Sequence, residues 1–523
     1  MRSAVKILGL MIICLTGLAQ SPRTALEFAA SGDARAHDEF IVGTIALHNS
    51  AYADAAIHFR KAQSIDANFV MAYWGEAMTF NHPFWGEQDI SGGRRALAKL
   101  APTRTARAAK AATPREREYL NAVELLYGEG DKDARDFDFA DAMKTVALRH
   151  PADYEAAAFY ALAILSARRI GDGNYAQTQS TAAAILKAIL DKYPDHPGGL
   201  HYLIHAYDDA DHAALALDAA HRYETLALAD STFHAIHMPT HIYAQLGMWP
   251  DVARLNQAAF AASDRWVRAN NFAAARRDYH SLDFLQYAQL QMGQYAEARE
   301  TVALMLAASR QARIPAMDDQ AAILSSRFAI EAGDWTAVAP FAPASRLPEL
   351  VFARGLGALQ AGDVASAKRM SVILAEVVQA DLTARRRVHA AAEDLLNRLL
   401  MARIALSENR SGDAERLGLD AVQAENRIEA PAELSGIFKP ATEFYGEILL
   451  ALQKPGDAET QFRASLKQRP KRALSLLGLA RARAMKKDTE GAAEAYRELA
   501  AIWINANPEL PALKEVRSFL QFH

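Results

Sequence analysis

The stretch Gly446–Pro470, GEILLALQKPGDAETQFRASLKQRP, carries the residue spacing that decides the fold. Its Ala458 recurs after 34 residues as Ala492, and Phe462 recurs at the same distance as Tyr496. The stretch begins with a glycine twelve residues before Ala458 and ends with a proline twelve residues after it. Small residues let two helices approach closely, and an aromatic residue one turn later fills the gap to the next helix. The stretch therefore predicts two packed helices that recur along the chain.

A 34-residue period with these residue types is the signature of the tetratricopeptide repeat (TPR). Near the N-terminus the same offsets recur at Gly43, Ala55, Phe59 and Ala62. Between these repeats the helical periodicity continues with irregular spacing, and no alternating strand pattern or Asn-Gly hairpin turn interrupts it. We therefore expect an all-α fold, a TPR-like α-solenoid in which antiparallel helix pairs form a superhelix.

The chain of 523 residues is longer than one hydrophobic core usually serves. The proline-rich run Trp335–Pro348 is the best candidate for a junction between two arrays. We expect an N-terminal TPR-like array over 35–335, which contains a histidine-rich pocket, and a C-terminal TPR array over 345–523.

The first residues have the pattern of a cleaved secretory signal. Arg2 and Lys6 precede the apolar run Ile7–Ala19, which is too short to span a bilayer. We expect a signal peptide over 1–19, a periplasmic or secreted protein, and no membrane span after cleavage. The only cysteine, Cys14, lies within that signal, so the mature protein is expected to hold neither disulfides nor cysteine-ligated metals.

Composition and motifs exclude several functional classes. The net charge of -4 offers no basic excess for a nucleic-acid backbone, so no nucleic-acid partner is expected. The chain has no His-Glu-x-x-His, Gly-x-Ser-x-Gly or Walker A motif. The sequence therefore leaves open whether the protein is an enzyme, and it indicates no cofactor other than a metal ion.

Histidines are concentrated in one part of the chain. Of the sixteen histidines, eight fall within residues 196–241. His201 and His205 are four residues apart in a helical context, so both rings lie on one face, about one turn apart. This spacing allows two imidazoles to bind one metal ion.

A second pair, His237 and His241, repeats this spacing with Pro239 between its members. If Pro239 is the first residue of a helix, the two rings can still converge, but helical spacing does not guarantee it. His280 opens a later predicted helix. Consecutive pairs of a stacked array line one concave surface, so His280 can meet the earlier histidines.

These observations predict a zinc or copper site with ligands drawn from His201, His205, His237, His241 and His280. The expected outer or alternate ligands are Asp208, His212, His234, Tyr202 and Tyr279. At an open coordination position, Tyr202, Tyr243 or Tyr279 could act as an acid or stabilise a radical. The alternative function is a metal-free TPR scaffold that binds a peptide or protein partner in its concave groove.

Five phrases resemble a set of secreted bacterial proteins known only as TPR-containing. They are HDEFIVGTIALHN (37–49), MAYWGEAMTFNHPFWGEQD (71–89), HPGGLHYLIHAYDDADHA (196–213), HMPTHIYAQLGMW (237–249) and RDYHSLDFLQYA (277–288). The resemblance covers the chain from His37 to about Ala308 and implies a helical superhelix with His201, His205, His237, His241 and His280 in its motifs. It implies no reaction. Asp283 departs from the expected pattern, in which an aromatic residue or a histidine would stand there.

Overall fold

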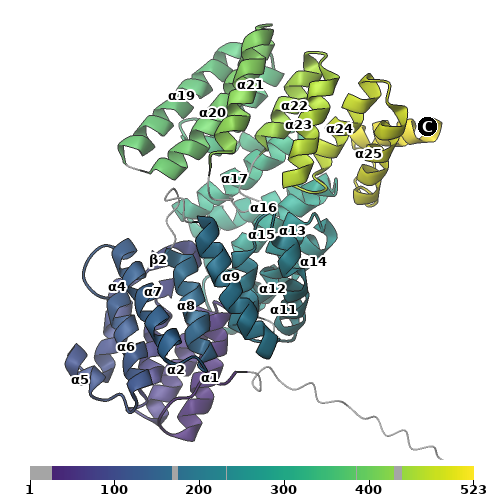
Figure 1. Ribbon diagram of the computed structural model, residues 1–523. Coiled ribbons are helices and arrows are strands. Elements are labelled where there is room, and N and C mark those ends of the chain that lie inside the picture. Colours follow the sequence, from purple (N-terminus) through teal and green to yellow (C-terminus); the bar gives the residue numbers. More distant parts are fainter. Residues whose placement is uncertain (1–25, 168–174, 231, 385, 429–438) are drawn as a thin grey trace, which may run out of the picture.

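Figure 1 shows the computed structural model of the chain, which describes residues 26–167, 175–230, 232–384, 386–428 and 439–523. The expected signal peptide over 1–19 lies outside the described residues.

The elements follow one another as α-helices, short 3-10 helices (η) and one pair of very short strands. The N-terminal part contains α1 (Ala34–His48), α2 (Tyr52–Ile65), α3 (Val70–Met78), β1 (Asn81–His82), η2 (Pro83–Trp85), β2 (Glu87–Gln88), α4 (Ile90–Leu100), α5 (Arg104–Ala108), α6 (Pro114–Leu126), α7 (Lys132–Arg149), α8 (Tyr154–Ala167) and α9 (Tyr175–Lys192). The central part contains α10 (Pro197–Ala206), η3 (Ala213–Ala216), α11 (Leu217–Asp230), α12 (Phe233–His237), α13 (Pro239–Gln245), α14 (Trp249–Ala269), η4 (Ala274–Arg276), α15 (Tyr279–Gln291), α16 (Tyr295–Ala312), α17 (Pro315–Ala332) and η5 (Trp335–Val338). The C-terminal part contains α18 (Pro348–Gln360), α19 (Val364–Thr383), α20 (Arg387–Ser407), α21 (Ser411–Glu425), α22 (Ala441–Ala451), α23 (Pro455–Gln468), α24 (Ala473–Met485), α25 (Thr489–Ile502) and α26 (Pro511–Phe522).

The structure confirms the all-α, TPR-like solenoid. Helices that are consecutive in the chain pack against one another and wind into a superhelix (Figure 1). The two strands form a single antiparallel hairpin in which Asn81 pairs with Gln88 and His82 pairs with Glu87. This hairpin connects α3 to α4 and leaves the fold class unchanged.

Aromatic residues fill the gaps between helix pairs as the repeat pattern predicts. The buried ring of Phe462 on α23 lies between Gly446 of α22 and Gly478 of α24. A Cβ atom on Gly446 would lie 2.9 Å from this ring, and one on Gly478 would lie 2.3 Å from it. Phe59 of α2 fills the same gap near the N-terminus. The ring thus packs on bare backbone on both sides and sets the distance between successive helices.

Contacts between the C-terminal repeats and the central helices close the superhelix: the turn between α23 and α24 and the residue after α25 lie against the start of α14 and the end of α15. The indole Nε1–H of Trp249 donates to the carbonyl oxygen of Lys471 at 2.9 Å. The amide of Ala473 donates to the Gln291 side chain at 3.1 Å, and the indole Nε1–H of Trp503 donates to the Gln291 carbonyl at 3.0 Å. Segments some two hundred residues apart in the chain are therefore held together by directional hydrogen bonds.

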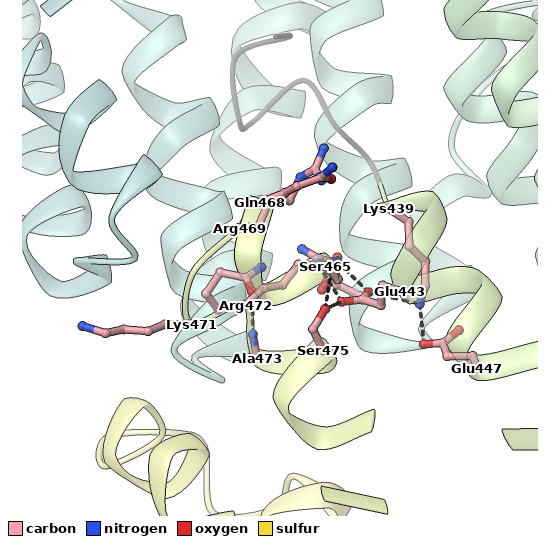
Figure 2. A network of polar contacts seen from close by, with 12 residues as sticks. Lys439, Glu443, Glu447, Ser465, Gln468, Arg469, Lys471, Arg472, Ala473 and Ser475 are labelled. Carbon is pink, nitrogen blue, oxygen red and sulfur yellow. Dashed lines mark hydrogen bonds and ion pairs between the residues drawn. The ribbon is translucent and has the colours of Figure 1, made fainter. Parts of the chain in front are cut away.

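A buried arginine lies at the centre of this closure. Arg472, in the turn between α23 and α24, points toward Glu443 of α22, with nitrogen-oxygen distances of 2.7 and 2.9 Å (Figure 2). It also pairs with Glu331 of α17 and donates to the Tyr287 hydroxyl of α15 at 3.1 Å. Ser475 completes the set by donating to Glu443 at 2.5 Å. Three helices from different parts of the chain thus share one charged group.

The proposed division into arrays at 335–345 stays a prediction. Partly buried Ile323, Ala337 and Phe341 contact the apolar clusters on both sides of this segment. Among the described residues, no helix combines the length and the apolar character needed to cross a bilayer.

The role of Phe462 gives a test of the packing. Phe462→Ala should lower the free energy of unfolding by about 3–5 kcal/mol, because it empties the space between two close helices. Ile504→Ala is the matched control, since that side chain is 78% exposed and its loss should change stability by less than about 0.5 kcal/mol. Denaturant unfolding followed by circular dichroism measures both, and equal effects of the two substitutions would contradict this packing.

Candidate metal centre

Four helices supply six imidazoles to one interior region. The contributing residues are His201 and His205 on α10, His234 and His237 on α12, His241 on α13, and His280 on α15. Two groups of three result, His201–His205–His234 and His237–His241–His280, and within each group the candidate ligand atoms all lie within 4.8 Å of one another. The predicted convergence is therefore present, but it forms two triads rather than one site, and His234 completes the first.

Local sequence explains how α10 presents its pair. Pro197 is the first helical residue, and the side chain of His196 accepts from the amide of Gly199 to cap the helix. Gly198 lets α10 lie against α1, since a Cβ atom there would come within 2.4 Å of the His48 ring. His201 and His205 then face the interior one turn apart, with their Nε2 atoms 3.2 Å from each other.

The second pair converges in spite of Pro239. This proline begins α13, and Met238 before it has helical dihedral angles, φ -54° and ψ -42°. Because α12 thus runs almost directly into α13, the turn-by-turn spacing of His237 and His241 is kept. Their Nε2 atoms are 3.0 Å apart.

Three of the rings are held by hydrogen bonds at Nδ1. That atom of His201 lies 2.5 Å from the carbonyl oxygen of His48, and that of His237 lies 2.6 Å from the Asn256 amide oxygen. Nδ1 of His241 lies 2.7 Å from the carboxylate of Asp208, which thus orients the ring, as expected of an outer residue of the site. In metal centres, ligating histidines characteristically donate their second N–H to such acceptors, which fixes the tautomer and the ring orientation.

The anchors determine which ring nitrogens carry protons. Asn256 donates its own amide to Val252 at 2.8 Å, so its oxygen is the atom that faces His237. The Nδ1 atoms of His237 and His241 both donate, and in the neutral rings their Nε2 atoms carry lone pairs. Two such lone pairs 3.0 Å apart repel each other unless a cation, either a proton or a metal ion, lies with them.

Burial disfavours the proton at this position. Removal from water, followed by the neighbouring histidines, holds the pKa of His237 and that of His234 well below the usual value. The same burial lowers the pKa of His201 to about 3. The Nε2 atom of His234 is also buried without a hydrogen-bond partner. Burial thus favours the neutral form of His201, His234 and His237, which is the form of imidazole that binds metal ions.

A third buried group, His48, Glu155 and His196, lacks this property. Glu155 accepts from Nε2 of His48 at 2.7 Å and from Nε2 of His196 at 2.9 Å. The remaining Nδ1 of His48 accepts from the Tyr202 hydroxyl at 2.9 Å, while that of His196 caps α10. Burial alone would raise the pKa of Glu155, but the two histidines lower it to about 2. With every ring nitrogen engaged, this group acts as a structural support that joins α1, α8 and α10.

Several predicted residues lie outside the two triads. His212 bonds to Asp209 and stacks on Tyr207, with ring centroids 5.7 Å apart. The three tyrosines expected as acids or radical-stabilising groups all use their hydroxyls elsewhere, because each finds a closer acceptor. Tyr202 donates to His48, Tyr243 to Glu224 and Tyr279 to the carbonyl of Ala274. Asp283, the departure from the expected pattern, pairs with the buried Arg327.

Sequence reasoning identified Asp208 as an outer residue of the site, but it did not identify the aromatic cover or the other two anchors, His48 and Asn256. Phe84 stacks on His205 with centroids 3.6 Å apart, and Trp85 lies 5.1 Å from the His234 ring. Both belong to the hairpin segment 81–88, whose aromatic character was visible in the sequence. His48 and Asn256 gave no such signal, since their role depends on tertiary contacts.

The lowered pKa values predict how the metal-free protein responds to acid. The pKa of His201 is about 3 in the folded state and 6.5 in an unstructured peptide, so the unfolded chain binds the proton between these values. The free energy of unfolding should therefore fall as pH decreases below 6.5, by up to about 1.4 kcal/mol per pH unit for each such histidine. The lowered pKa values of His234 and His237 also make the free energy of unfolding fall as pH decreases.

Urea unfolding of chelator-treated protein between about pH 7 and pH 5 measures this slope. His234→Leu should reduce it, whereas His212→Ala, which alters a half-exposed ring, should leave it unchanged. A free energy of unfolding that does not vary over this range would contradict the burial of neutral imidazoles.

Comparisons with known proteins match this chain to solved structures only. No protein-family model matches the chain, and no curated protein matches it. A tetratricopeptide repeat protein from Parabacteroides merdae is 13% identical over 55% of this chain and 98% of its own, with a TM-score of 0.31. A chain of the APC/C hetero-tetramer Cut9-Hcn1 is 13% identical over 96% of this chain and 98% of its own, with a TM-score of 0.29. The TPR domain of P58(IPK) is 14% identical over 94% of this chain and 99% of its own, with a TM-score of 0.23. At these TM-scores the likeness carries no argument, and the fold assignment rests on the helix packing of this chain.

Proposed function

We propose that this protein is an exported metal-binding protein that holds two zinc or copper ions, one in each histidine triad. The observation that carries this proposal is the pair of facing Nε2 atoms of His237 and His241, 3.0 Å apart and both turned inward by anchored Nδ1 atoms. A metal ion would remove the repulsion between them and would use the lone pairs of both.

The anchors favour metal binding over a chance cluster of histidines. Asp208 is itself fixed by Gln245, whose amide donates to it at 3.0 Å, so the contacts extend outward from the ring in an ordered series. Such support holds ligands in one orientation before the ion arrives, which reduces the entropy lost on binding. Zinc and copper suit a set of imidazole ligands without thiolates.

The alternative function, binding of a peptide, is supported at a different place. His201, His237 and His241 are buried, so a peptide main chain would not reach them without rearrangement. A groove of about 660 Å³ lies instead in the C-terminal array, where Arg403, Glu447 and Tyr496 line it. Occupation of that groove would not depend on metal.

The metal content of the untagged, full-length protein tests the proposal. Elemental analysis after equilibration with zinc or copper should find two ions per chain. His205→Ala and His280→Ala, each at a partly exposed position in a different triad, should each lower this to about one ion. His212→Ala is the matched control and should retain both ions. Protein that takes up neither metal in stoichiometric amount would overturn the proposal.

Loss of an outer anchor should weaken binding without removing a ligand. Asp208→Ala or Asn256→Ala should reduce metal affinity roughly 10–100-fold, because His241 or His237 loses its fixed orientation. Competition with a chromogenic chelator measures this change. Asp218→Ala removes a carboxylate whose side chain is 82% exposed on α11, and it should leave affinity unaltered. Equal affinities for all three variants would show that the anchors do not support a metal site.

The exported location rests on the basic and apolar residues of 1–19. Fractionation of cells that produce the full chain, with N-terminal sequencing of the product, tests it. Protein recovered from the cytoplasm with residue 1 intact would refute this part of the proposal.

A further inference from the structure

The two triads are in direct contact with each other. The ring centroids of His205 and His241, which belong to different triads, are 5.7 Å apart, and those of His234 and His237 are 6.0 Å apart. Within the triads the corresponding distances are 5.0 Å for His201 and His205 and 4.9 Å for His237 and His241. Spacing between the triads is therefore close to spacing within them. Two ions held here would be neighbours in one chamber.

The composition of the chamber distinguishes between metals. Each triad offers three imidazoles, and neither of these two groups contains a carboxylate as a ligand. The nearest acid, Asp208, is engaged with His241 and Gln245. Dinuclear zinc would bring four positive charges into this buried space, whereas dinuclear copper(I) would bring two. Because the cost of burying charge rises steeply with its amount, the chamber favours monovalent copper.

The cover over the chamber is apolar. Phe84 stacks on His205, Trp85 lies against His234, and Phe284 lies 4.8 Å from His237 and 4.9 Å from His241 between ring centroids. Trp85 is itself 46% exposed, so the hairpin segment 81–88 separates the chamber from solvent by little more than one layer of side chains. The cover is incomplete, since His205 and His280 stay partly exposed, so a small ligand can approach the two triads from solvent.

Resting on the proposed metal binding, we infer that the two triads form one dinuclear copper centre that binds dioxygen. Each copper(I) gives one electron to the same oxygen molecule, which becomes peroxide bound between two copper(II) ions. The bond order between the oxygen atoms falls from two to one, and no proton or further reductant is required. The charge brought into the chamber is two positive units before and after this step. The reaction therefore needs no new counter-ion in the buried space.

The experiment uses the untagged, full-length protein loaded with copper(I) without air and then exposed to oxygen. One oxygen molecule should be consumed per two copper ions, with an intense near-ultraviolet absorption band. The oxidised centre should give no electron paramagnetic resonance signal, since a shared peroxide couples the two copper(II) spins. His205→Ala and His280→Ala should each retain one copper, lose the band and give a signal from an isolated copper(II). His212→Ala should behave as the unaltered protein.

The outcomes separate this inference from the proposed function. Two bound copper ions that take up no oxygen, or that oxidise to two uncoupled signals, would overturn the dioxygen inference and leave metal binding intact. Two bound zinc ions with no stoichiometric copper would likewise overturn the dioxygen inference and leave metal binding intact. Absence of any stoichiometric metal would overturn the proposed function, and the inference with it.

Discussion

Close packing of an aromatic ring on bare backbone of both neighbouring helices is the constraint on which the rest of this structure depends. Phe59 and Phe462 occupy that position near the two ends of the chain. A TPR helix pair buries its apolar face only against its neighbours, so this contact fixes how each pair follows the last. Helices α10, α12, α13 and α15 belong to the stack of helices between these two positions, and their histidines face one interior region. The centre is thus a product of scaffold packing, and ligand chemistry acts within limits that the scaffold sets.

Sequence spacing predicted much of the fold and part of the site. The 34-residue recurrence from Phe462 to Tyr496 indicated the helix pairs. The pairing of His201 with His205 followed from helical geometry alone. The convergence of His237 with His241 did not follow from it, because that convergence depends on the dihedral angles of Met238, the residue before Pro239.

The remaining features of the site are tertiary and had no local signal. The carbonyl of His48 that holds His201 comes from a helix about 150 residues away in the chain. The side chains of His212 and Tyr279 lie close in sequence to true members of the cluster. They turn to acceptors of their own, because a polar group is satisfied by the partner it can reach in space. Sequence proximity therefore overestimated the number of residues that face the centre.

The closure of the superhelix has a consequence for the order in which the molecule assembles. The turn around Arg472 contacts Trp249, which begins α14 shortly after the end of α13, and Gln291, the last residue of α15. His241 and His280, by contrast, lie near the starts of α13 and α15. All six histidines leave the ribosome before that turn is made. The helices that carry the histidines are therefore made before the turn that braces their opposite ends. Until the last repeats have folded, the start of α14 and the end of α15 lack the hydrogen bonds that tie this end of the stack to the C-terminal part of the chain.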